Sequence, residues 1–367
     1  MADQAIVQRA KDLVERLSRK PRFAGSPEES EARQLCRDEL ERTGFECVER
    51  GFSYSQWPGR WGVPVAAAVQ TATIFVVART AMHRGPLIAL VVGAALYVAL
   101  AFASADVKRR RITALALMPA RSVNLEALRG KPSVWLVAHL DSKSQTVPML
   151  IRIASSIAMG AVTLATAIVL LISLRGGSEV AATWDALQIV ALVVALPSIL
   201  CWVRNESPGA VDNASGVAAV LLAAQSLSPV RDLGVVITSG EELGLAGARA
   251  WASQAQPSVV ALNCDTVDDR GGWRLMYTGA RPRRISAAAG AISASMGMRS
   301  AIGWSIPGIL ADSMAFADRG IESVTVSRGT LFTLARIHTR RDNSNVLTGI
   351  GVAEASAILS ALVKELV

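Results

Sequence analysis

Four apolar blocks, each roughly 18 to 22 residues long and without a formal charge, constrain the fold of this sequence more than any other feature. As helices, segments of this length cross the hydrocarbon core of a bilayer. They pair into two hairpins with short connectors, so we expect all remaining residues to lie on one side of a membrane. The blocks are residues 61–78, 85–105, 153–174 and 186–203.

The composition agrees with a chain that is part membrane and part soluble. Hydrophobic residues make up 51% of the chain, and the mean hydropathy is +0.36. That average is too apolar for an ordinary soluble enzyme with this charge content, and the excess lies in the four blocks. A buried core helix is the alternative for each block. It is stronger for the first block, which contains Gln70, and for the fourth, which contains Gln188 and Pro197.

Charges near the blocks predict the orientation in the membrane. Residues 106–111, after the second block, include four basic residues, whereas the connector 175–185 of the second hairpin is net negative. Arg79 and Arg84 in the first connector argue weakly in the opposite direction. By the positive-inside rule we expect a multi-pass integral membrane protein whose soluble part is cytoplasmic. The amphipathic pattern of residues 1–17 shows no apolar core of a cleavable signal.

The cysteines and the net charge are compatible with that location. The four cysteines have no close pair and no metal-binding spacing, which suits a reducing compartment. The net charge of +8 fits attraction to anionic lipid. No nucleic-acid-binding motif is visible, so we expect the lipid bilayer and no nucleic acid as a partner. The sequence predicts no particular oligomeric state.

About 270 residues lie outside the hairpins, which is enough for one α/β domain. Apolar runs of strand length alternate there with helical patterns such as residues 216–227 and 352–366. The alternation predicts an α/β fold with a mostly parallel central sheet flanked by helices, into which the two hairpins are inserted. The predicted strands are 133–139, 233–240, 258–265 and 322–329. The predicted soluble domain has three parts, 1–60, 106–148 and 204–367, and the hairpins occupy 61–105 and 149–203.

Three of the predicted strands end in, or run into, a side chain that can bind metal. In open α/β sheets ligands bind beyond the carboxyl ends of the strands, so these side chains could converge on one crevice. A carboxylate before a helical pattern and a late histidine would complete the set. The candidates are, in chain order, His139 with Asp141, Asp212, Glu241, Glu242, Asp265 and His338.

Each candidate has an ordinary alternative when it is taken alone. His139 could be a core histidine, Asp212 a helix N-cap, and the adjacent glutamates a solvated first turn. Asp265 could belong to an acidic loop and His338 to the surface. Together, however, two histidines and three carboxylates form a donor set that zinc accepts. Two zinc ions about 3.5–4 Å apart need one bridging carboxylate, and the remaining glutamate could then take a proton from water.

The sequence around these candidates resembles the di-zinc aminopeptidase family, which also contains glutamate carboxypeptidase II and the glutaminyl cyclases. Further similarity lies in residues 22–52 and 309–329, so the resemblance covers nearly all of the chain outside the hairpins. The motifs that carry it are HLDS (139–142), PGAVDNASGVA (208–218), SGEELGLAGARAW (239–251), NCDTV (263–267) and IHTRRDN (337–343).

The resemblance implies a zinc exopeptidase fold and two zinc ions per chain. It also implies a bridging carboxylate, a general base and a residue that orients one histidine. By motif, the first zinc would be bound by His139 and Asp265 and the second by Glu242 and His338, with Asp212 bridging, Glu241 as the base and Asp141 orienting His139.

The sequence departs from the family in one place. About 70 residues separate the His-x-Asp motif from the Asp-Asn motif, where soluble members have a short loop, and they contain the whole second hairpin. The hairpin is therefore predicted to be an insertion between two ligands of one metal centre. At a maximum of roughly 3.3–3.6 Å per residue, the site lies within about 30 to 40 Å of the bilayer. We hypothesise that its mouth lies near the membrane and receives membrane-associated peptides.

These inferences predict an integral-membrane, zinc-dependent exopeptidase, with aminopeptidase activity as the first choice. Another amide hydrolysis, glutaminyl cyclisation and a catalytically silent membrane scaffold are the alternatives. The complete ligand set and the intact glutamate pair favour hydrolysis. A transporter is disfavoured because no block has an ionisable residue in its middle. Asp312 and residues 339–343 are candidate substrate contacts or structural groups.

Overall fold

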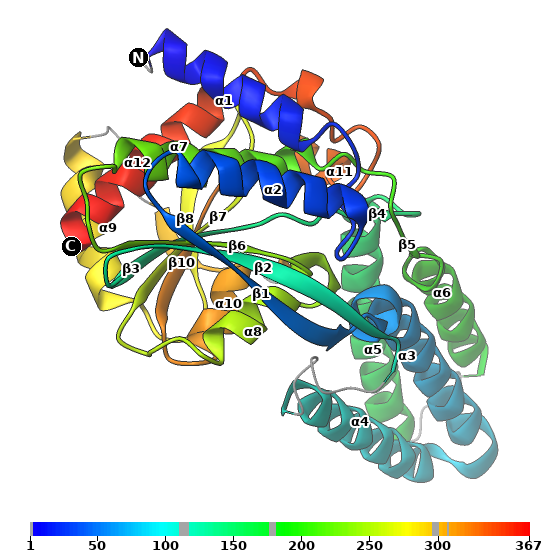
Figure 1. Ribbon diagram of the computed structural model, residues 1–367. Helices are drawn as coiled ribbons and strands as arrows, with labels where there is room; N and C mark the ends of the chain where they lie inside the picture. Colours follow the sequence, from blue (N-terminus) through cyan, green and yellow to red (C-terminus); the bar gives the residue numbers. More distant parts are fainter. Residues whose placement is uncertain (1–2, 110–116, 176–180, 296–300, 307) are drawn as a thin grey trace. The chain divides into compact units, whose positions relative to one another are not determined.

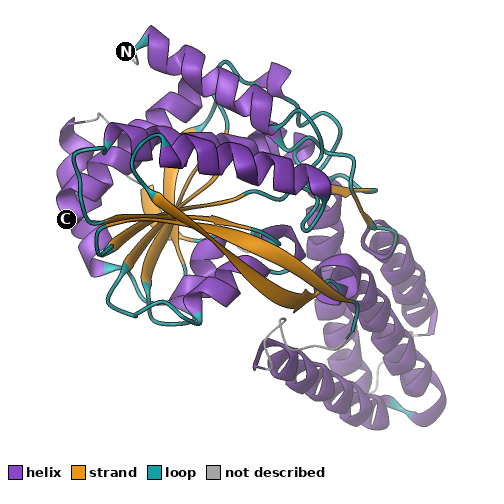
Figure 2. Ribbon diagram, in the orientation of Figure 1, coloured by secondary structure: helices purple, strands orange, loops and turns teal. Residues whose placement is uncertain are grey.

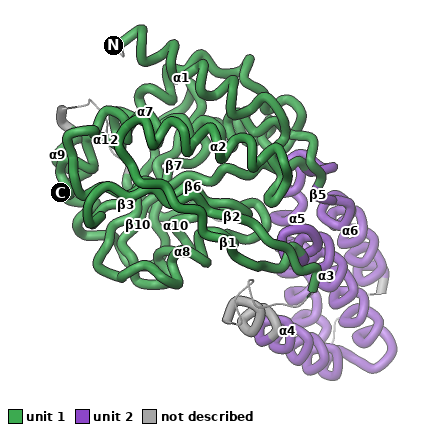
Figure 3. Tube along the Cα trace, viewed as in Figure 1, with its two compact units in different colours: residues 1–56, 116–144, 204–367 green, residues 57–115, 145–203 purple. Residues whose placement is uncertain are grey.

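The computed structural model describes residues 3–109, 117–175, 181–295, 301–306 and 308–367. The chain divides into two compact units that alternate along the sequence (Figure 3). Unit 1 comprises residues 1–56, 116–144 and 204–367, and unit 2 comprises residues 57–115 and 145–203. Part of the basic cluster 106–111 and of the connector 175–185, which were used to predict orientation, lies outside the described residues.

Unit 1 is built on an eight-stranded sheet (Figure 2). Its four central strands, β6, β3, β7 and β10, run parallel, and β1, β2 and β8 contribute the antiparallel pairs. The strands follow in the order β1 (Glu46–Ser55), β2 (Pro119–Arg129), β6 (Leu233–Thr238), β3 (Val134–His139), β7 (Val260–Val267), β10 (Glu322–Gly329), β8 (Gly272–Tyr277) and β9 (Ala301–Trp304).

The parallel strands are apolar without alternation because both faces of the sheet are covered. Every residue of β3 and β6 is buried, as expected for strands with helices on either side. One face carries α1 (Gln4–Leu17), α2 (Pro27–Glu41), α7 (Ser215–Ser226), α9 (Arg283–Ser295) and α12 (Ile350–Leu366) (Figure 1). The other carries α8 (Ala246–Ala252) and α10 (Asp312–Ala317). The predicted largely parallel sheet flanked by helices is confirmed.

Aromatic rings fill the core between the sheet and α8 and α10. Trp251 lies between Trp135 and Phe316, with ring centroids 5.1 Å and 5.2 Å apart and edge-to-face geometry. Such pairs add to the stabilisation that burial of their area provides. This packing fixes β3 and β6, whose carboxyl ends carry several of the candidate residues.

Unit 2 consists of α3 (Trp57–Arg84), α4 (Pro86–Arg109), α5 (Met149–Leu174) and α6 (Ala181–Ile199). Three of these helices, α3, α5 and α6, are long and apolar enough to cross a membrane. The apolar part of α4 among the described residues, Pro86–Phe102, is shorter. Three candidate spans are therefore established by length and composition, and the fourth stays a prediction.

Several short elements complete the fold. A two-stranded ribbon pairs β4 (Ser144–Gln145) with β5 (Val203–Arg204). A helical turn η2 (Ala210–Ala214) leads into α7, and a 3-10 turn η3 (Glu241–Leu243) follows β6. Helix α11 (Leu331–Arg336) and a second 3-10 turn, η4 (Ser344–Val346), flank the late histidine motif. Most of the candidate residues thus lie on turns held by the sheet.

Candidate metal centre

The structure brings all of the predicted metal ligands together at the carboxyl ends of the parallel strands. His139 is the last residue of β3, and Asp265 lies near the end of the adjacent strand β7. Glu242 lies on η3, Asp212 on η2, and His338 two residues after α11. All five side chains are buried. Their convergence follows from the parallel order of the strands, which places these ends at one edge.

These side chains form two groups that share Asp212. In the first group His139 Nε2 lies 3.2 Å from Asp212 Oδ1 and 3.4 Å from Asp265 Oδ1. In the second group His338 Nε2 lies 3.1 Å from Asp212 Oδ2 and 3.0 Å from Glu242 Oε1. Within each group the potential ligand atoms lie within 4.8 Å of one another. Asp212 therefore offers one carboxylate oxygen to each group, which is the geometry that a bridging ligand needs.

The potential ligand atoms are better suited to binding metal ions than to hydrogen bonding with one another. Among the described residues, neither His139 Nε2 nor Glu242 Oε1 has a hydrogen-bond partner, although both atoms are buried. Buried polar atoms are otherwise almost always paired. An excess of buried negative charge is also unfavourable unless cations balance it. The buried carboxylates around the two histidines are Asp141, Asp212, Glu241, Glu242, Asp265 and Asp312.

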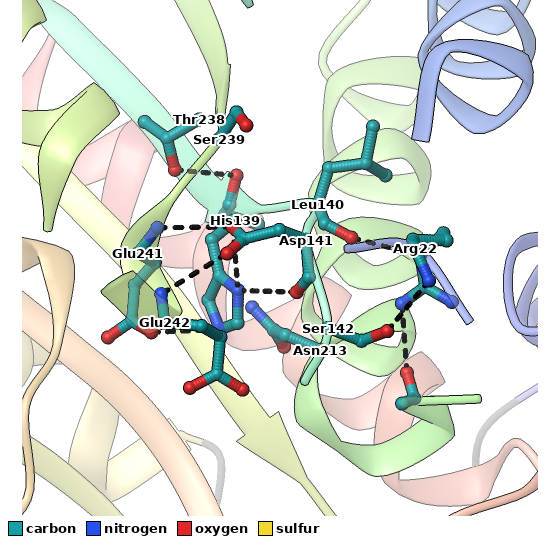
Figure 4. Close-up of polar contacts among 12 residues, drawn as sticks. Arg22, His139, Leu140, Asp141, Ser142, Asn213, Thr238, Ser239, Glu241 and Glu242 are labelled. Atoms are coloured by element: carbon teal, nitrogen blue, oxygen red, sulfur yellow. Dashed lines mark hydrogen bonds and ion pairs between the residues drawn. The ribbon is translucent and has the colours of Figure 1, made fainter. Parts of the chain in front are cut away.

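Asp141 lies beside His139, where the sequence predicted an orienting residue, and its main chain and side chain make separate contacts (Figure 4). His139 Nδ1 lies 3.1 Å from the backbone carbonyl oxygen of Asp141 and 3.7 Å from its carboxylate. The carboxylate instead accepts hydrogen bonds from the backbone amides of Glu241 and Glu242, at 3.1 Å and 3.2 Å. Asp141 thus orients the histidine through its main chain, and its side chain holds the turn that carries the two glutamates.

Glu241 lies at the edge of the first group. Its Oε2 is 4.0 Å from His139 Nε2, and the side chain is buried. Burial raises the pKa of Glu241 well above its usual value, and the neighbouring carboxylates raise it further, while His139 lowers it. Glu241 thus lies beside the first ligand group without belonging to either group.

Lys143 is part of the site, although the sequence patterns did not single it out. Its Nζ lies 2.7 Å from Glu242 Oε2 and donates a hydrogen bond to the Glu242 carbonyl oxygen at 3.0 Å. One oxygen of Glu242 therefore faces His338 and the other faces the ammonium. The only signal in the sequence is a lysine directly after the HLDS motif.

Of the candidate substrate contacts, Asp312 and Asp342 are buried and bond to parts of the site, whereas Arg340 and Arg341 are exposed. Asp312 is fully buried and accepts a hydrogen bond from the Thr238 hydroxyl at the end of β6. Burial raises the pKa of Asp312 to about 7, although His139 and the Thr238 hydroxyl lower it. Asp342, also buried, accepts hydrogen bonds from the backbone amides of Val211 and Asp212.

A parallel α/β sheet that ends in two buried carboxylate–histidine groups with a shared aspartate defines a two-metal hydrolase. The model of Peptidase family M28 matches residues 123–363, and the chain belongs to that family. This membership and the two buried ligand groups confirm the predictions of a zinc metallopeptidase and of positions for two zinc ions. No curated protein sequence matches the chain.

Solved structures with the same fold include aminopeptidases and glutaminyl cyclases. An aminopeptidase from Aneurinibacillus sp. strain AM-1 is 14% identical, with a TM-score of 0.56, and the match covers 98% of this chain and 93% of that one. The zinc aminopeptidase BSAP from Bacillus subtilis is 13% identical, with a TM-score of 0.58 and coverage of 98% and 94%. Fimbriiglobus ruber glutaminyl cyclase is 15% identical, with a TM-score of 0.53 and coverage of 100% and 97%. At these identities the likeness shows the fold alone.

Proposed function

We propose that this protein is an integral-membrane zinc aminopeptidase that removes N-terminal residues from peptides. The observation that carries the proposal is the pair of buried ligand groups that share Asp212, with Glu241 beside the first group. In this proposal His139 and Asp265 hold one zinc ion and Glu242 and His338 hold the other. The similarity to solved aminopeptidases is consistent with this assignment.

The proposed mechanism uses Glu241 to move a proton. When bound at the two groups, zinc ions polarise a substrate carbonyl and make water more acidic. Glu241 takes the proton from the attacking water and delivers it to the leaving amine, so it ends each cycle in its starting state. Asp141 keeps Glu241 in place by accepting the amide hydrogen bonds of the η3 turn. Lys143 holds one oxygen of Glu242, which leaves the other oxygen for the metal.

Membrane integration is supported by the helices of unit 2. Besides the three helices of spanning length, Trp61 near the start of α3 and Trp202 just after α6 are 41% and 47% exposed. Tryptophan is enriched where membrane helices meet the interface. The charge rule places unit 1 on the cytoplasmic side in this proposal.

The proposed substrates are membrane-associated peptides because the segments that carry two ligands of the site lead directly into and out of the second hairpin. Helix α5 begins ten residues after His139, and α6 ends thirteen residues before Asp212. The chain segments that carry His139 and Asp212 are thus continuous with the two helices of the second hairpin.

The test uses detergent-purified wild-type protein and the Glu241→Gln variant, incubated with a defined peptide mixture and followed by mass spectrometry. Stepwise loss of N-terminal residues by the wild type alone, abolished by a chelator, would support the aminopeptidase. Conversion of N-terminal glutamine to pyroglutamate would indicate cyclisation instead. Bound zinc without cleavage would favour another amide substrate. Absence of both zinc and cleavage would favour a catalytically silent scaffold.

A further inference from the structure

The two segments that flank the second hairpin are bonded to each other on the side of unit 1. We call residues 139–144 and 204–212 the junction. Ser142 Oγ donates a hydrogen bond to the Ser207 carbonyl oxygen at 3.0 Å. Ser144 Oγ accepts one from the Glu206 amide at 2.9 Å. The junction carries His139 at one end and Asp212 at the other, so its geometry determines the distance between two ligands of the first group.

A buried arginine from a third segment lies against the junction (Figure 4). Arg22 follows α1 and is 1% exposed. Its guanidinium donates to the carbonyl oxygens of Leu140 at 2.9 Å, Pro208 at 2.6 Å and Gly209 at 3.0 Å. It also donates to the carbonyl oxygen of Leu17 at 2.8 Å. One side chain thus bonds both halves of the junction, directly beside His139 and three residues before Asp212.

The main chain of Arg22 reinforces this contact. Its amide donates to Ser142 Oγ at 2.9 Å, and the Ser142 amide donates to its carbonyl oxygen at 2.9 Å. The packing leaves no room for a side chain at Gly209, where φ is +60°. A Cβ atom there would lie 2.6 Å from Ser142 Cβ and 3.3 Å from Arg22 Nη2.

Opposite charges hold the two sides of the Asp212 turn. Arg22 binds the carbonyl oxygens that precede the turn, and Asp342 accepts the amides of Val211 and Asp212 at 2.7 Å and 3.2 Å. Burial lowers the pKa of Arg22, while the buried carboxylates Asp342 and Asp141 raise it. Arginine suits this position because its planar fork can serve several carbonyl oxygens at once, whereas lysine carries a single point charge.

We propose that Arg22 is a positioning residue that holds His139 and Asp212 at metal-binding distance across the inserted hairpin. The inference rests on the ligand roles proposed above. It assigns a function to an N-terminal residue outside the segment that matches the family model. Arg22 contacts neither ligand side chain, so it acts only through the backbone of the two turns.

The test measures cobalt binding to the detergent-solubilised full chain after metal removal, by titration and by the absorption spectrum of the bound ion. The variants are Arg22→Met and Arg22→Lys. The control is Arg33→Met, which removes a buried arginine of α2 that pairs with Glu49 at 3.2 Å and touches no ligand turn. Residues that orient metal ligands without binding the metal themselves typically contribute about 10- to 100-fold to metal affinity.

We expect Arg22→Met to lose about tenfold or more in cobalt affinity and to change the cobalt spectrum. Arg22→Lys should fall between it and the wild type, and Arg33→Met should match the wild type in both readouts. Wild-type affinity and spectrum in both Arg22 variants would overturn the inference while leaving the proposed function intact. If Arg22→Met does not fold, wild-type affinity and spectrum in Arg22→Lys would be enough to overturn the inference. A wild type that binds no cobalt would instead overturn the proposed function and this inference together.

Discussion

The two units of this protein differ in the side chains that they bury and expose. Unit 1 encloses seven carboxylates, two histidines and an arginine around the candidate metal centre. Unit 2 exposes large apolar side chains along its helices, with Leu87 64%, Ile157 69% and Ile189 64% exposed. In water, apolar surface of that extent would favour association, whereas in a bilayer it meets lipid. Unit 1 thus holds buried charge, whereas unit 2 exposes the kind of surface that the proposed membrane integration requires.

The interiors differ in the same way. Unit 1 is held by dense packing and by charged groups that bond to the backbone. In unit 2, Gly93 lets α4 approach α3, since a Cβ at that position would lie 3.1 Å from Val77 Cγ2. Gln70 Nε2 donates to Thr163 Oγ1 at 2.8 Å between α3 and α5. Close approach at small residues and sparse interhelical hydrogen bonds are typical of membrane bundles.

The largest expected effect comes from the carboxylate that the two ligand groups share. Asp212→Ala should remove both bound metal ions and lower kcat/KM by about a thousandfold or more, because each ion contributes several kcal/mol to the transition state. Asp265→Ala should remove only one ion. Metal analysis of the purified variants and peptide assays check both results. Equal metal loss in the two variants would contradict the bridging role of Asp212.

Removal of metal should lower the stability of unit 1 and leave that of unit 2 unchanged. A chelator should destabilise unit 1 by about 3 to 4 kcal/mol for each zinc ion removed, relative to a state with zinc at 100 to 1,000 times its dissociation constant. Unit 2 holds no such ligand group among its described residues, so its helices should melt at an unchanged temperature. Thermal unfolding followed by tryptophan fluorescence and circular dichroism, with and without chelator, measures this difference. A parallel shift of both units would mean that they unfold together.

Lys143 provides a smaller electrostatic test within unit 1. Its ammonium lies against Glu242, so it repels a cation bound at the second group. The repulsion acts on a divalent ion, so its removal should outweigh the loss of the contact that holds Glu242. Lys143→Met should therefore tighten metal binding at that group by about tenfold, which corresponds to about 1.4 kcal/mol. Calorimetric titration of zinc into the metal-free variant measures the change. Arg249→Met, which removes a cation that pairs with Asp318 at 3.1 Å, is the control and should leave affinity unchanged.

The smallest expected effect is in unit 2. Gln70→Leu removes the hydrogen bond to Thr163 and should lower bundle stability by about 0.6 kcal/mol, the average for such bonds in membranes. Peptidase activity should not change. Unfolding in mixed micelles gives the free energy, and the peptide assay gives kcat. A loss of activity comparable to that of Glu241→Gln would refute the division of roles between the units.

The sequence could predict the fold class and the members of the site because both depend on local residue patterns. The apolar runs at β3, β6, β7 and β10 indicate buried parallel strands. The order of those strands then brings His139, Asp265 and the η3 turn to one edge. Residue type alone makes His139 and Asp265 suitable for zinc.

Other features of the site could not be predicted because they depend on backbone groups far away in the sequence. The sequence does not indicate which four carbonyl oxygens Arg22 binds, since every residue has a backbone carbonyl. The same holds for the amides that Asp141 and Asp342 accept. Lys143 was missed because its significance lies in the 2.7 Å contact with Glu242, about 100 residues away in the sequence.

The sequence by itself thus determined which side chains can bind metal and which helices are apolar enough to cross a membrane, because composition and spacing are local properties. Only the tertiary structure decided that Asp212 faces both groups, that Asp141 uses its carboxylate on the η3 turn, and that Arg22 bonds the two segments flanking the hairpin. Those contacts arise from packing of the sheet and its helices, which places distant backbone groups at hydrogen-bonding distance.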